Sequence, residues 1–497
     1  MRNILSFFII CFSIFPQANA VSDRANDTAE YAATTYQQAM VDSLASLIKH
    51  QTFAVEGLGV LDNPQHIAFR DDLKKQAESL GLEFVDHGYV LIVALGNSQE
   101  RVGVITHGDV QPVDATKWAK SPFELDQTSE PGKLIARGTE DDKGPISTAL
   151  YAMKAIKDKN VPLKKRIELY VYMAEESDWD PIRAYIKEHT LPQINITIDA
   201  EYPVVTAEKG WSLIKMTFPD KKIAANQPYL TSFKSGAFVS QIPEDATVVI
   251  EKADKQLVTK LEARAKKHPK MTYQFNLQGD QLVISAKGRA AHSSTPEDGV
   301  NALVHLADLL AVKRWPNNSA GALVNFLNDH VGLGIEGELF GKIAYSDDFM
   351  GPMTVSPTLL KSNDQGIELS INMRRPRGKT KALLAQQIDT VLNSWQEENG
   401  ISLSGIDRYI GDPYIQDKAP HVNTLLNVFT HFTGIQNAQP ISIGGGTNSR
   451  LFPNAVAFGP AMPGAEYTGH SEHEFITMEQ FVLNLKMYTA VLIELAR

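Results

Sequence analysis

Hydrophobic residues in the first and last parts of the chain fall into two alternating patterns. Short apolar runs, each of strand length, cover residues 89–95, 102–106, 167–174, 194–198 and 455–458. Between them, apolar residues recur at helical spacing over residues 146–156, where Pro145 can open the first turn. Buried strands alternating with helices predict an α/β fold, with a doubly wound sheet covered on both faces.

The pattern changes between residues 213 and 410. Residues 273–277 and 281–286 flank Gln278-Gly279-Asp280 as in a β-hairpin, and residues 300–310 show helical spacing. This α+β organisation differs from the parts that flank it, so we expect an inserted domain. The predicted organisation is residues 21–212 and 411–497 as two parts of one domain, with 213–410 as the insertion.

The N-terminal segment has the order of a secretory signal. Arg2 precedes an apolar run at residues 4–15, and Gln17-Ala18-Asn19-Ala20 offers an A-x-A cleavage site. The alternative, a membrane anchor, needs about 20 apolar residues and finds fewer. We therefore predict removal of residues 1–20 and secretion, in a bacterium to the periplasm. Cys11 is the only cysteine, so the mature chain would need His, Asp or Glu to hold any metal.

Composition narrows the class of protein. With 43% hydrophobic and 21% charged residues, the chain is typical of globular proteins, and no later segment is apolar for long enough to span a bilayer. The net charge is -10 without a basic stripe, which argues against a nucleic-acid partner because phosphate binding needs clustered Lys and Arg. Stable membrane insertion is likewise not expected.

Polar motifs directly follow three of the predicted strands. They are His107-Gly108-Asp109, Glu175-Glu176 and Asp199. Side chains at the carboxyl ends of strands in an open α/β sheet lie close together, and acidic groups held together need a cation to neutralise them. Each motif alone has an ordinary alternative: a surface histidine, a solvated strand end or, for Asp141-Asp142, a helix cap.

Taken in order, the motifs resemble the M20 family of metallopeptidases over nearly the whole mature chain. The matching segments are His107-Gly108-Asp109-Val110, Arg137 to Pro145, Ala174-Glu175-Glu176-Ser177, Asp199 to Pro203 with Glu208-Lys209-Gly210, and Gly469 to Glu474. Asp142, the Asp199 to Pro203 stretch and the long insertion are most similar to the dipeptidase V branch. The resemblance implies a doubly wound mixed-sheet catalytic domain with an inserted α+β lid domain.

The resemblance also implies a two-metal site. Its ligands would be His107, Asp141, Glu176, Asp199 and His470. Asp141 would bridge two divalent ions, with His107 and Asp199 completing one shell and Glu176 and His470 the other. Zinc is the expected metal, with manganese or cobalt as alternatives. His473 is a rival for His470, and a cis peptide bond is expected between Asp141 and Asp142.

Catalytic and orienting roles follow from the same resemblance. Glu175 would be the general base that takes a proton from water and returns it to the leaving amine. Asp109 would orient His107 through its carboxylate, and Glu474 would orient His470.

In the lid, His292 of Gly288 to Ser294 resembles the histidine that binds the oxyanion. Arg374 resembles the arginine that pairs with a substrate carboxylate, with Arg375 as a rival. Asn372 departs from the more usual Asp of the family, and Ser240-Gln241 from its lid Asn. Gly445, Gly446 and Thr447 are expected to line the substrate cleft, because glycine lets a peptide approach the backbone closely.

These expectations converge on metal-dependent hydrolysis of short peptides, foremost dipeptides. The alternatives are an N-acyl amino acid deacylase of the same family and a noncatalytic periplasmic peptide-binding protein, against which a retained Glu175 argues. The large insertion would stand in for a partner's lid, so we predict an active monomer with His292 acting in cis.

Overall fold

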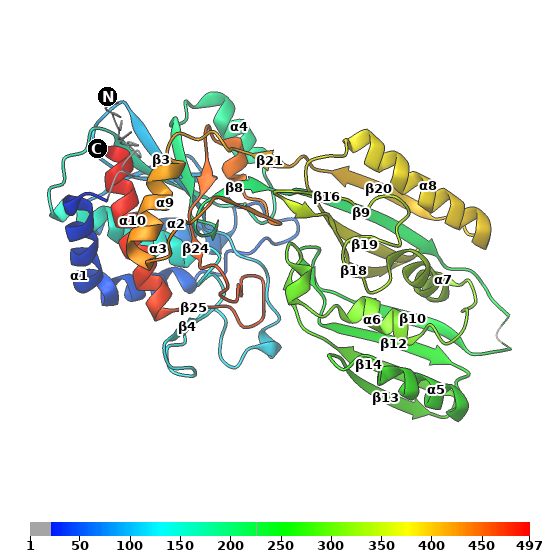
Figure 1. Ribbon diagram of the computed structural model, residues 1–497. Coiled ribbons are helices and arrows are strands. Elements are labelled where there is room, and N and C mark those ends of the chain that lie inside the picture. Colours follow the sequence, from blue (N-terminus) through cyan, green and yellow to red (C-terminus); the bar gives the residue numbers. More distant parts are fainter. Residues whose placement is uncertain (1–20, 225) are drawn as a thin grey trace, which may run out of the picture.

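The computed structural model describes residues 21–224 and 226–497, so the predicted signal at residues 1–20 lies outside it. Two bodies lie side by side in Figure 1, and each has its own hydrophobic core. One core draws on both ends of the chain, from Ala25 to Ala496. The other draws only on residues between Ile214 and Leu403. The molecule therefore has a discontinuous domain with a second domain inserted into it.

A mixed nine-stranded sheet forms the centre of the discontinuous domain. Its order is β1 (Glu83–Asp86), β2 (Val90–Leu95), β5 (Arg166–Tyr172), β3 (Arg101–His107), β6 (Ile194–Thr197), β23 (Val456–Ala457), β8 (Val205–Glu208) and β21 (Tyr414–Ile415), with β22 (Ile441–Ile443) also paired to β8. β5, β3, β6 and β23 are parallel neighbours, whereas β1, β2 and β21 pair antiparallel.

Alternate side chains of β2 pack into hydrophobic cores on opposite faces of the sheet, as expected for a doubly wound sheet. Leu91 and Val93 of β2 join the core formed with α1 (Asp23–Ile48), α2 (Pro64–Ser79), α3 (Lys143–Asp158), α9 (Val422–Thr433) and α10 (Met478–Ala496). Ile92 and Ala94 pack on the opposite face, with Ile182 of α4 (Asp180–Glu188). The α/β prediction is confirmed, and α3 contains the predicted helix with Pro145 in its first turn.

The inserted domain has two antiparallel four-stranded sheets and helices, which confirms its α+β class. One sheet has the order β10 (Tyr229–Ser235), β12 (Asp245–Glu251), β14 (Gln281–Lys287), β13 (Thr272–Gln278); the other β18 (Thr354–Asn363), β19 (Gly366–Arg375), β9 (Gly210–Pro219), β20 (Ser404–Ile410). The helices are α5 (Lys255–Ala265), α6 (Ala302–Leu309), α7 (Ser319–Phe326) and α8 (Lys381–Asn399). β13 and β14 form the expected hairpin, and Gly279 at its tip has a φ of 64°.

The chain enters and leaves the inserted domain at one place. β8 ends at Glu208, which pairs with Tyr414 of β21, so the strands before and after the insertion are neighbours. The two crossings touch: a Cβ on Gly210 would lie 2.3 Å from the carbonyl oxygen of Gly411. Glycine is therefore required where the two segments cross, and this narrow double connection suits a lid.

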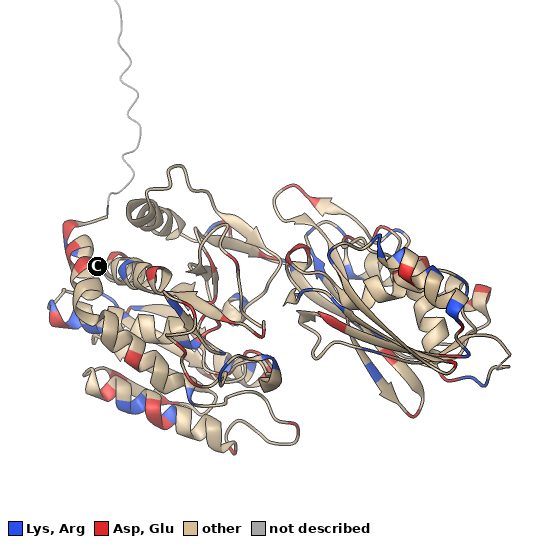
Figure 2. Ribbon diagram, turned by 90° about the horizontal axis from the view of Figure 1, so that it is seen from below, with Lys and Arg blue, Asp and Glu red and all other residues tan. Residues whose placement is uncertain are grey.

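Two-stranded pairs complete the fold: β4 (Lys133–Ile135) with β25 (Phe475–Thr477), β7 (Ala200–Glu201) with β24 (Pro460–Ala461), β11 (Gln241–Ile242) with β15 (Ala291–His292), and β16 (Ser346–Asp347) with β17 (Gly351–Pro352). Acidic and basic residues are interspersed over both bodies (Figure 2). In the part of the chain that the structure describes, no helix is long and apolar enough to cross a membrane.

Candidate metal centre

Three parallel strands bring the first group of polar residues together. His107 is the last residue of β3, Glu175 and Glu176 follow β5, and Asp199 follows β6, so their positions at adjacent strand ends converge. His107 Nε2 lies 3.7 Å from Asp199 Oδ1. The carboxylate of Asp109 accepts hydrogen bonds from the backbone N–H groups of Glu175 (2.9 Å) and Glu176 (3.0 Å), which fixes the end of β5 against that of β3.

Asp141 lies between the two histidines. Its Oδ1 is 2.9 Å from His107 Nε2, and its Oδ2 is 3.0 Å from His470 Nε2. His470 Nε2 also lies 2.7 Å from Glu176 Oε1. The two oxygens of one carboxylate thus face two different imidazoles, the arrangement that a bridging ligand requires. The bond between Asp141 and Asp142 is cis, as predicted.

The tautomer of His107 follows from its backbone contact. Its Nδ1 lies 2.9 Å from the carbonyl oxygen of Asp109, and a carbonyl can only accept, so Nδ1 carries the proton. In the protonated ring Nε2 donates to Asp141 Oδ1, and loss of that proton would free the Nε2 lone pair for a cation between His107, Asp141 and Asp199. The Asp109 carboxylate also faces Nδ1, with Oδ1 at 3.5 Å, so Asp109 contacts His107 through both its carbonyl and its carboxylate, and the carboxylate holds the β5 end as well.

Glu474 stabilises the Asp141 loop and makes no hydrogen bond to His470, which corrects the expectation that it orients that histidine. This fully buried carboxylate accepts hydrogen bonds from the N–H groups of Gly138, Glu140 and Asp141 and from Arg137 Nη1, at 2.8 to 3.1 Å. The loop of His470 lies beside that of Asp141 because β25 pairs with β4. His470 is instead held by the lid, where Gln241 Nε2 donates to its carbonyl oxygen at 3.0 Å.

The electrostatics of the cluster favour positive charge. Although burial opposes protonation, Glu176 and Asp141 raise the pKa of His470 to about 10, and the carboxylates around His107 raise its pKa as well. Burial raises the pKa of Asp199 to about 6. The buried oxygens Glu175 Oε1 and Asp142 Oδ1 have no hydrogen-bond partner. An anionic site with unsatisfied oxygens and imidazole donors fits divalent cations.

Among the residues that the structure describes, two groupings of ligand atoms are compact enough to hold an ion. One comprises His107, Asp141 and Glu176, and the other His107, Asp142 and Asp199, each with its ligand atoms within 4.8 Å of one another. This differs from the expected shells in including Asp142. We favour Asp141 as the shared ligand because it alone contacts both imidazoles, whereas one Asp142 oxygen already accepts the Thr106 hydroxyl.

His292 reaches the centre from the lid of the same chain. Its ring centroid is 4.6 Å from that of His470. Its Nδ1 accepts from the backbone N–H of Ser294 at 3.4 Å, which leaves the proton of the neutral ring on Nε2. Burial, with the nearby His470 and Arg374, lowers the pKa of His292 well below its ordinary value, so the ring stays neutral.

Arg374 is buried beside His292 and has no anionic partner. Its Nη2 donates to Ser293 Oγ (3.0 Å), its Nη1 to the carbonyl of Gly444 (3.3 Å), and its Nε to Asn372 Oδ1 (3.2 Å). Among the described residues, no carboxylate forms an ion pair with it. Burial lowers its pKa to about 9, which a bound anion would offset.

The rival residues point elsewhere. Arg375 Nη1 donates to the carbonyl of Gly411 (2.7 Å) and to Asp412 (3.1 Å), at the crossing between the domains. His473 is half exposed and bonds to Glu130. Neither side chain reaches the cluster around Asp141.

The loop that contains Gly444, Gly445 and Gly446 lies close to the backbone of the lid. The sequence predicts that glycine here makes room for a peptide, whereas the nearest backbone in the structure is that of the lid. A Cβ on Gly444 would lie 2.2 Å from the carbonyl oxygen of Ser294, so the closest backbone is that of the lid. At Gly445 and Gly446 a Cβ would make only ordinary contacts. Thr447 is buried and hydrogen-bonded to Glu208 through both its N–H and its hydroxyl.

Residues that sequence reasoning missed also contact the centre. Gln111 Nε2 donates to Glu176 Oε2 at 2.7 Å, and the hydroxyl of Tyr467 donates to Asp141 Oδ2 at 2.9 Å. Both lie within or next to the recognised motifs. Lys117 bridges the two domains through Glu244 (2.7 Å) and Asp245 (2.6 Å), a pairing that no motif indicated.

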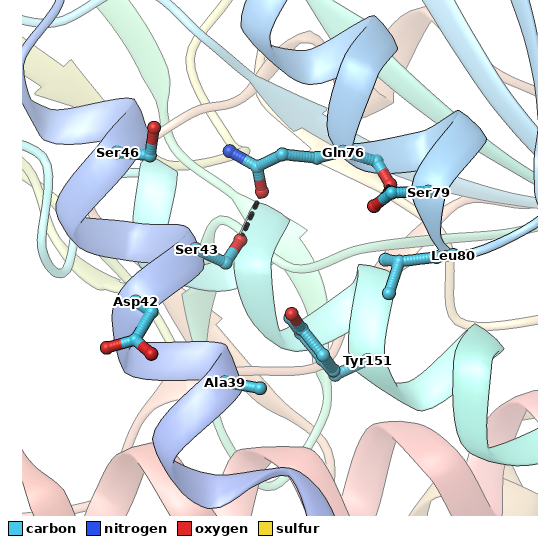
Figure 3. Close-up of a pocket in the computed structure, with 8 residues that line it drawn as sticks. All are labelled: Ala39, Asp42, Ser43, Ser46, Gln76, Ser79, Leu80 and Tyr151. Atoms are coloured by element: carbon cyan, nitrogen blue, oxygen red, sulfur yellow. Dashed lines mark hydrogen bonds between the residues drawn. The ribbon is translucent and has the colours of Figure 1, made fainter.

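A separate polar cavity of about 260 Å³ lies between α1, α2 and α3 (Figure 3). Ser43 donates across it to Gln76 Oε1, and Asp42, Ser46 and Tyr151 also line it. It shares no residue with the cluster around Asp141 and contains no histidine.

Comparison with known proteins agrees with this geometry. Residues 103–494 match the model for peptidase family M20/M25/M40. The Beta-Ala-Xaa dipeptidase of Lactobacillus delbrueckii subsp. lactis is 29% identical over 410 residues, covering 82% of this chain and 84% of its own. In fold, human carnosine dipeptidase 1 is similar with a TM-score of 0.56 (14% identity, 96% and 99% of the two chains). The dipeptidase Dug1p of Saccharomyces cerevisiae is similar with a TM-score of 0.58 (11%, 95% and 98%).

Proposed function

The chain belongs to peptidase family M20/M25/M40 and is a metallopeptidase; we propose that it cleaves dipeptides, using two divalent cations and Glu175 as general base. The observation that carries the proposal is Asp141, whose two oxygens face His107 and His470 separately. Asp199 would complete the shell on the His107 side, and Glu176 that on the His470 side. Zinc is the ion we propose, with manganese or cobalt as the alternatives to test.

Divalent cations, when bound, would supply Lewis-acid chemistry: they neutralise the carboxylates, acidify water and polarise a carbonyl. Glu175 is suited to the proton transfers. Burial and the neighbouring Asp199 and Glu176 raise its pKa well above its ordinary value, and bound cations would oppose this rise, so that it starts as a carboxylate and can still hold a proton. It takes a proton from water as the water oxygen bonds to the carbonyl carbon. It then gives that proton to the amide nitrogen as the C–N bond breaks.

His292 is proposed to donate a hydrogen bond from Nε2–H to the carbonyl oxygen as negative charge develops there, and it keeps its proton throughout. The hydrogen bond from Ser294 N–H to Nδ1 favours the required tautomer. A neutral donor fixed in a buried site needs no reorganisation during the reaction. His292 and the proposed ligands belong to one chain, and this supports an active monomer with His292 acting in cis.

Arg374 is proposed to bind the substrate's terminal carboxylate, and its position limits peptide length. It bonds to Ser293, the residue after His292, so a carboxylate on Arg374 lies near a carbonyl on His292. One extended residue spans only about 3.3 to 3.6 Å. A single residue after the scissile bond therefore fits best, as in a dipeptide.

An N-acyl amino acid would offer Arg374 the same carboxylate. The two substrate classes differ on the other side of the scissile bond, where a dipeptide has a free amine and an N-acyl amino acid has none. The test uses protein stripped with a chelator and reloaded singly with Zn²⁺, Mn²⁺ or Co²⁺. Ala-Ala, β-Ala-Ala, Ala-Ala-Ala and N-acetyl-Ala are the substrates, with Glu175→Gln as the inactive control. Hydrolysis confined to the dipeptides is expected. Preference for N-acetyl-Ala would make the protein a deacylase, and binding without turnover would make it a peptide-binding protein.

We further propose that the protein acts after export, in the bacterial periplasm. The support is the order of charged, apolar and small residues over positions 1–20. N-terminal sequencing of the protein expressed with its native N-terminus should find Val21 first. A protein that retains Met1 would contradict export by cleavage.

A further inference from the structure

Tyr467 contacts the centre from the loop that carries His470. Its hydroxyl donates to Asp141 Oδ2 at 2.9 Å, and the same oxygen lies 3.0 Å from His470 Nε2. The other oxygen, Oδ1, lies 2.9 Å from His107 Nε2. One loop thus supplies two of the contacts to a single oxygen of the shared carboxylate.

The loop is shaped to bring the phenol to that oxygen. A Cβ on Gly469 would lie 2.3 Å from the Tyr467 hydroxyl oxygen and 2.4 Å from the carbon that bears it. Only glycine leaves room for the tyrosine to fold back over its own chain. His470, the next residue, has a φ of 64°, which turns its imidazole toward Asp141 and Glu176. The two side chains are therefore presented together by one strained turn.

The contact restricts how Asp141 can rotate. A carboxylate is free to turn about its Cβ–Cγ bond unless its two oxygens are held differently. Here Oδ2 has a neutral donor that stays in place whatever charge His470 carries, and Oδ1 has none. A cation on either side leaves a lone pair of Oδ2 for the phenol, so both contacts can be made at once.

We propose that Tyr467 is a positioning residue: its hydroxyl sets the rotation of Asp141 so that each carboxylate oxygen serves a different cation. The inference rests on the proposed two-cation function. Of the two proposed cation sites, the one that depends on Tyr467 is the site formed by Glu176 and His470. Groups that orient metal ligands through a hydrogen bond commonly change metal affinity by 10- to 100-fold when they are removed.

The test is a Mn²⁺ titration of metal-free full-length protein. Calorimetry measures the binding steps, and electron paramagnetic resonance detects the spin-coupled pair of ions. Tyr467→Phe keeps the ring and removes the hydroxyl. One binding step should weaken by about 10- to 100-fold while the other changes less than about threefold, and the coupled signal should need more Mn²⁺. Gly469→Ala, which displaces the hydroxyl but keeps the tyrosine, should reproduce this result. Tyr409→Phe, in an exposed side chain of β20, is the matched control and should change neither step.

Activity separates positioning from direct catalysis. With both sites filled by excess Mn²⁺, the kcat of Tyr467→Phe should return to within about threefold of the wild-type value. Unchanged binding steps would overturn the proposal. A kcat that stays about 100-fold low at saturation would also overturn it, because that is the loss expected for a donor to the reacting atoms. Two-step binding by a wild type that cleaves no dipeptide would refute the proposed substrate and leave the role of Tyr467 standing. Uptake of a single ion would overturn both.

Discussion

His292 and His470 lie with their ring centroids 4.6 Å apart, at an interplanar angle of 78°, although one belongs to the lid and the other to the catalytic domain. The lid is therefore closed over the centre within a single chain. Gln241 of the neighbouring strand β11 and Ser240, which precedes it, also contact His470, and Lys117 pairs with Glu244 and Asp245 across the same boundary. Closure brings an imidazole from the lid to the proposed reaction site.

Replacing His292 should lower turnover far more than it lowers metal binding. We expect His292→Ala to reduce kcat by about 100- to 1000-fold at unchanged metal content, because an oxyanion donor acts mainly in the transition state. Steady-state kinetics and metal analysis of the same preparation measure both quantities. Mixing His292→Ala with Glu175→Gln protein then tests the cis assignment. Activity above the sum of the two separate variants would show that the lid histidine is supplied by a partner.

Glu175→Gln should abolish most activity without removing the metal. The variant keeps the size of the side chain but cannot carry a proton, so kcat should fall by at least about 100-fold. Glu176→Gln is the matched comparison: its contact with His470 at 2.7 Å predicts lower occupancy of one metal site. Near-native turnover of Glu175→Gln would mean that another group is the base.

Arg374 and Arg375 are adjacent in sequence but should differ in substitution experiments. Arg374→Lys removes the planar fork beside Ser293 and should raise KM for dipeptides by about 10- to 100-fold, the loss of a charge-assisted hydrogen bond. Arg375→Lys should leave KM within about threefold, because its contacts are with Gly411 and Asp412. Equal KM values for the two variants would contradict a carboxylate site at Arg374.

His421 should make folding stability depend on pH below neutrality. Burial lowers its pKa from 6.5 to about 4, and its Nε2 donates to the carbonyl of Asn195 at 3.0 Å. Between these values the unfolded chain binds a proton that the folded protein does not, so stability falls as the pH drops from 6.5 toward 4. The free energy of unfolding should fall by about 2 to 3 kcal/mol more in the wild type than in His421→Gln between pH 7.5 and pH 4.5. Urea unfolding at both pH values measures it, and equal losses would contradict a buried neutral His421.

The sequence by itself determined the layered fold, the family and most of the polar cluster. Apolar runs such as residues 102–106 and 167–174 predicted buried strands, because hydrophobic burial is encoded locally by residue type and spacing. The motifs at their ends predicted which residues converge, because adjacent parallel strands end at the same edge of the sheet.

Only the tertiary structure decided which atoms meet. The carboxylate of Glu474 binds backbone N–H groups of the Asp141 loop instead of His470, and that of Asp109 holds the end of β5 in addition to facing His107. Arg374 rather than Arg375 turns toward the site because successive side chains of a strand face opposite sides, and the register of β19 against β9 sets which side is which. Tyr467 and Gln111 contact the centre through chain segments far apart in the sequence, Tyr467 being 326 residues from Asp141. Hydrogen bonds depend on distances of a few tenths of an ångström, which packing sets and residue spacing does not encode.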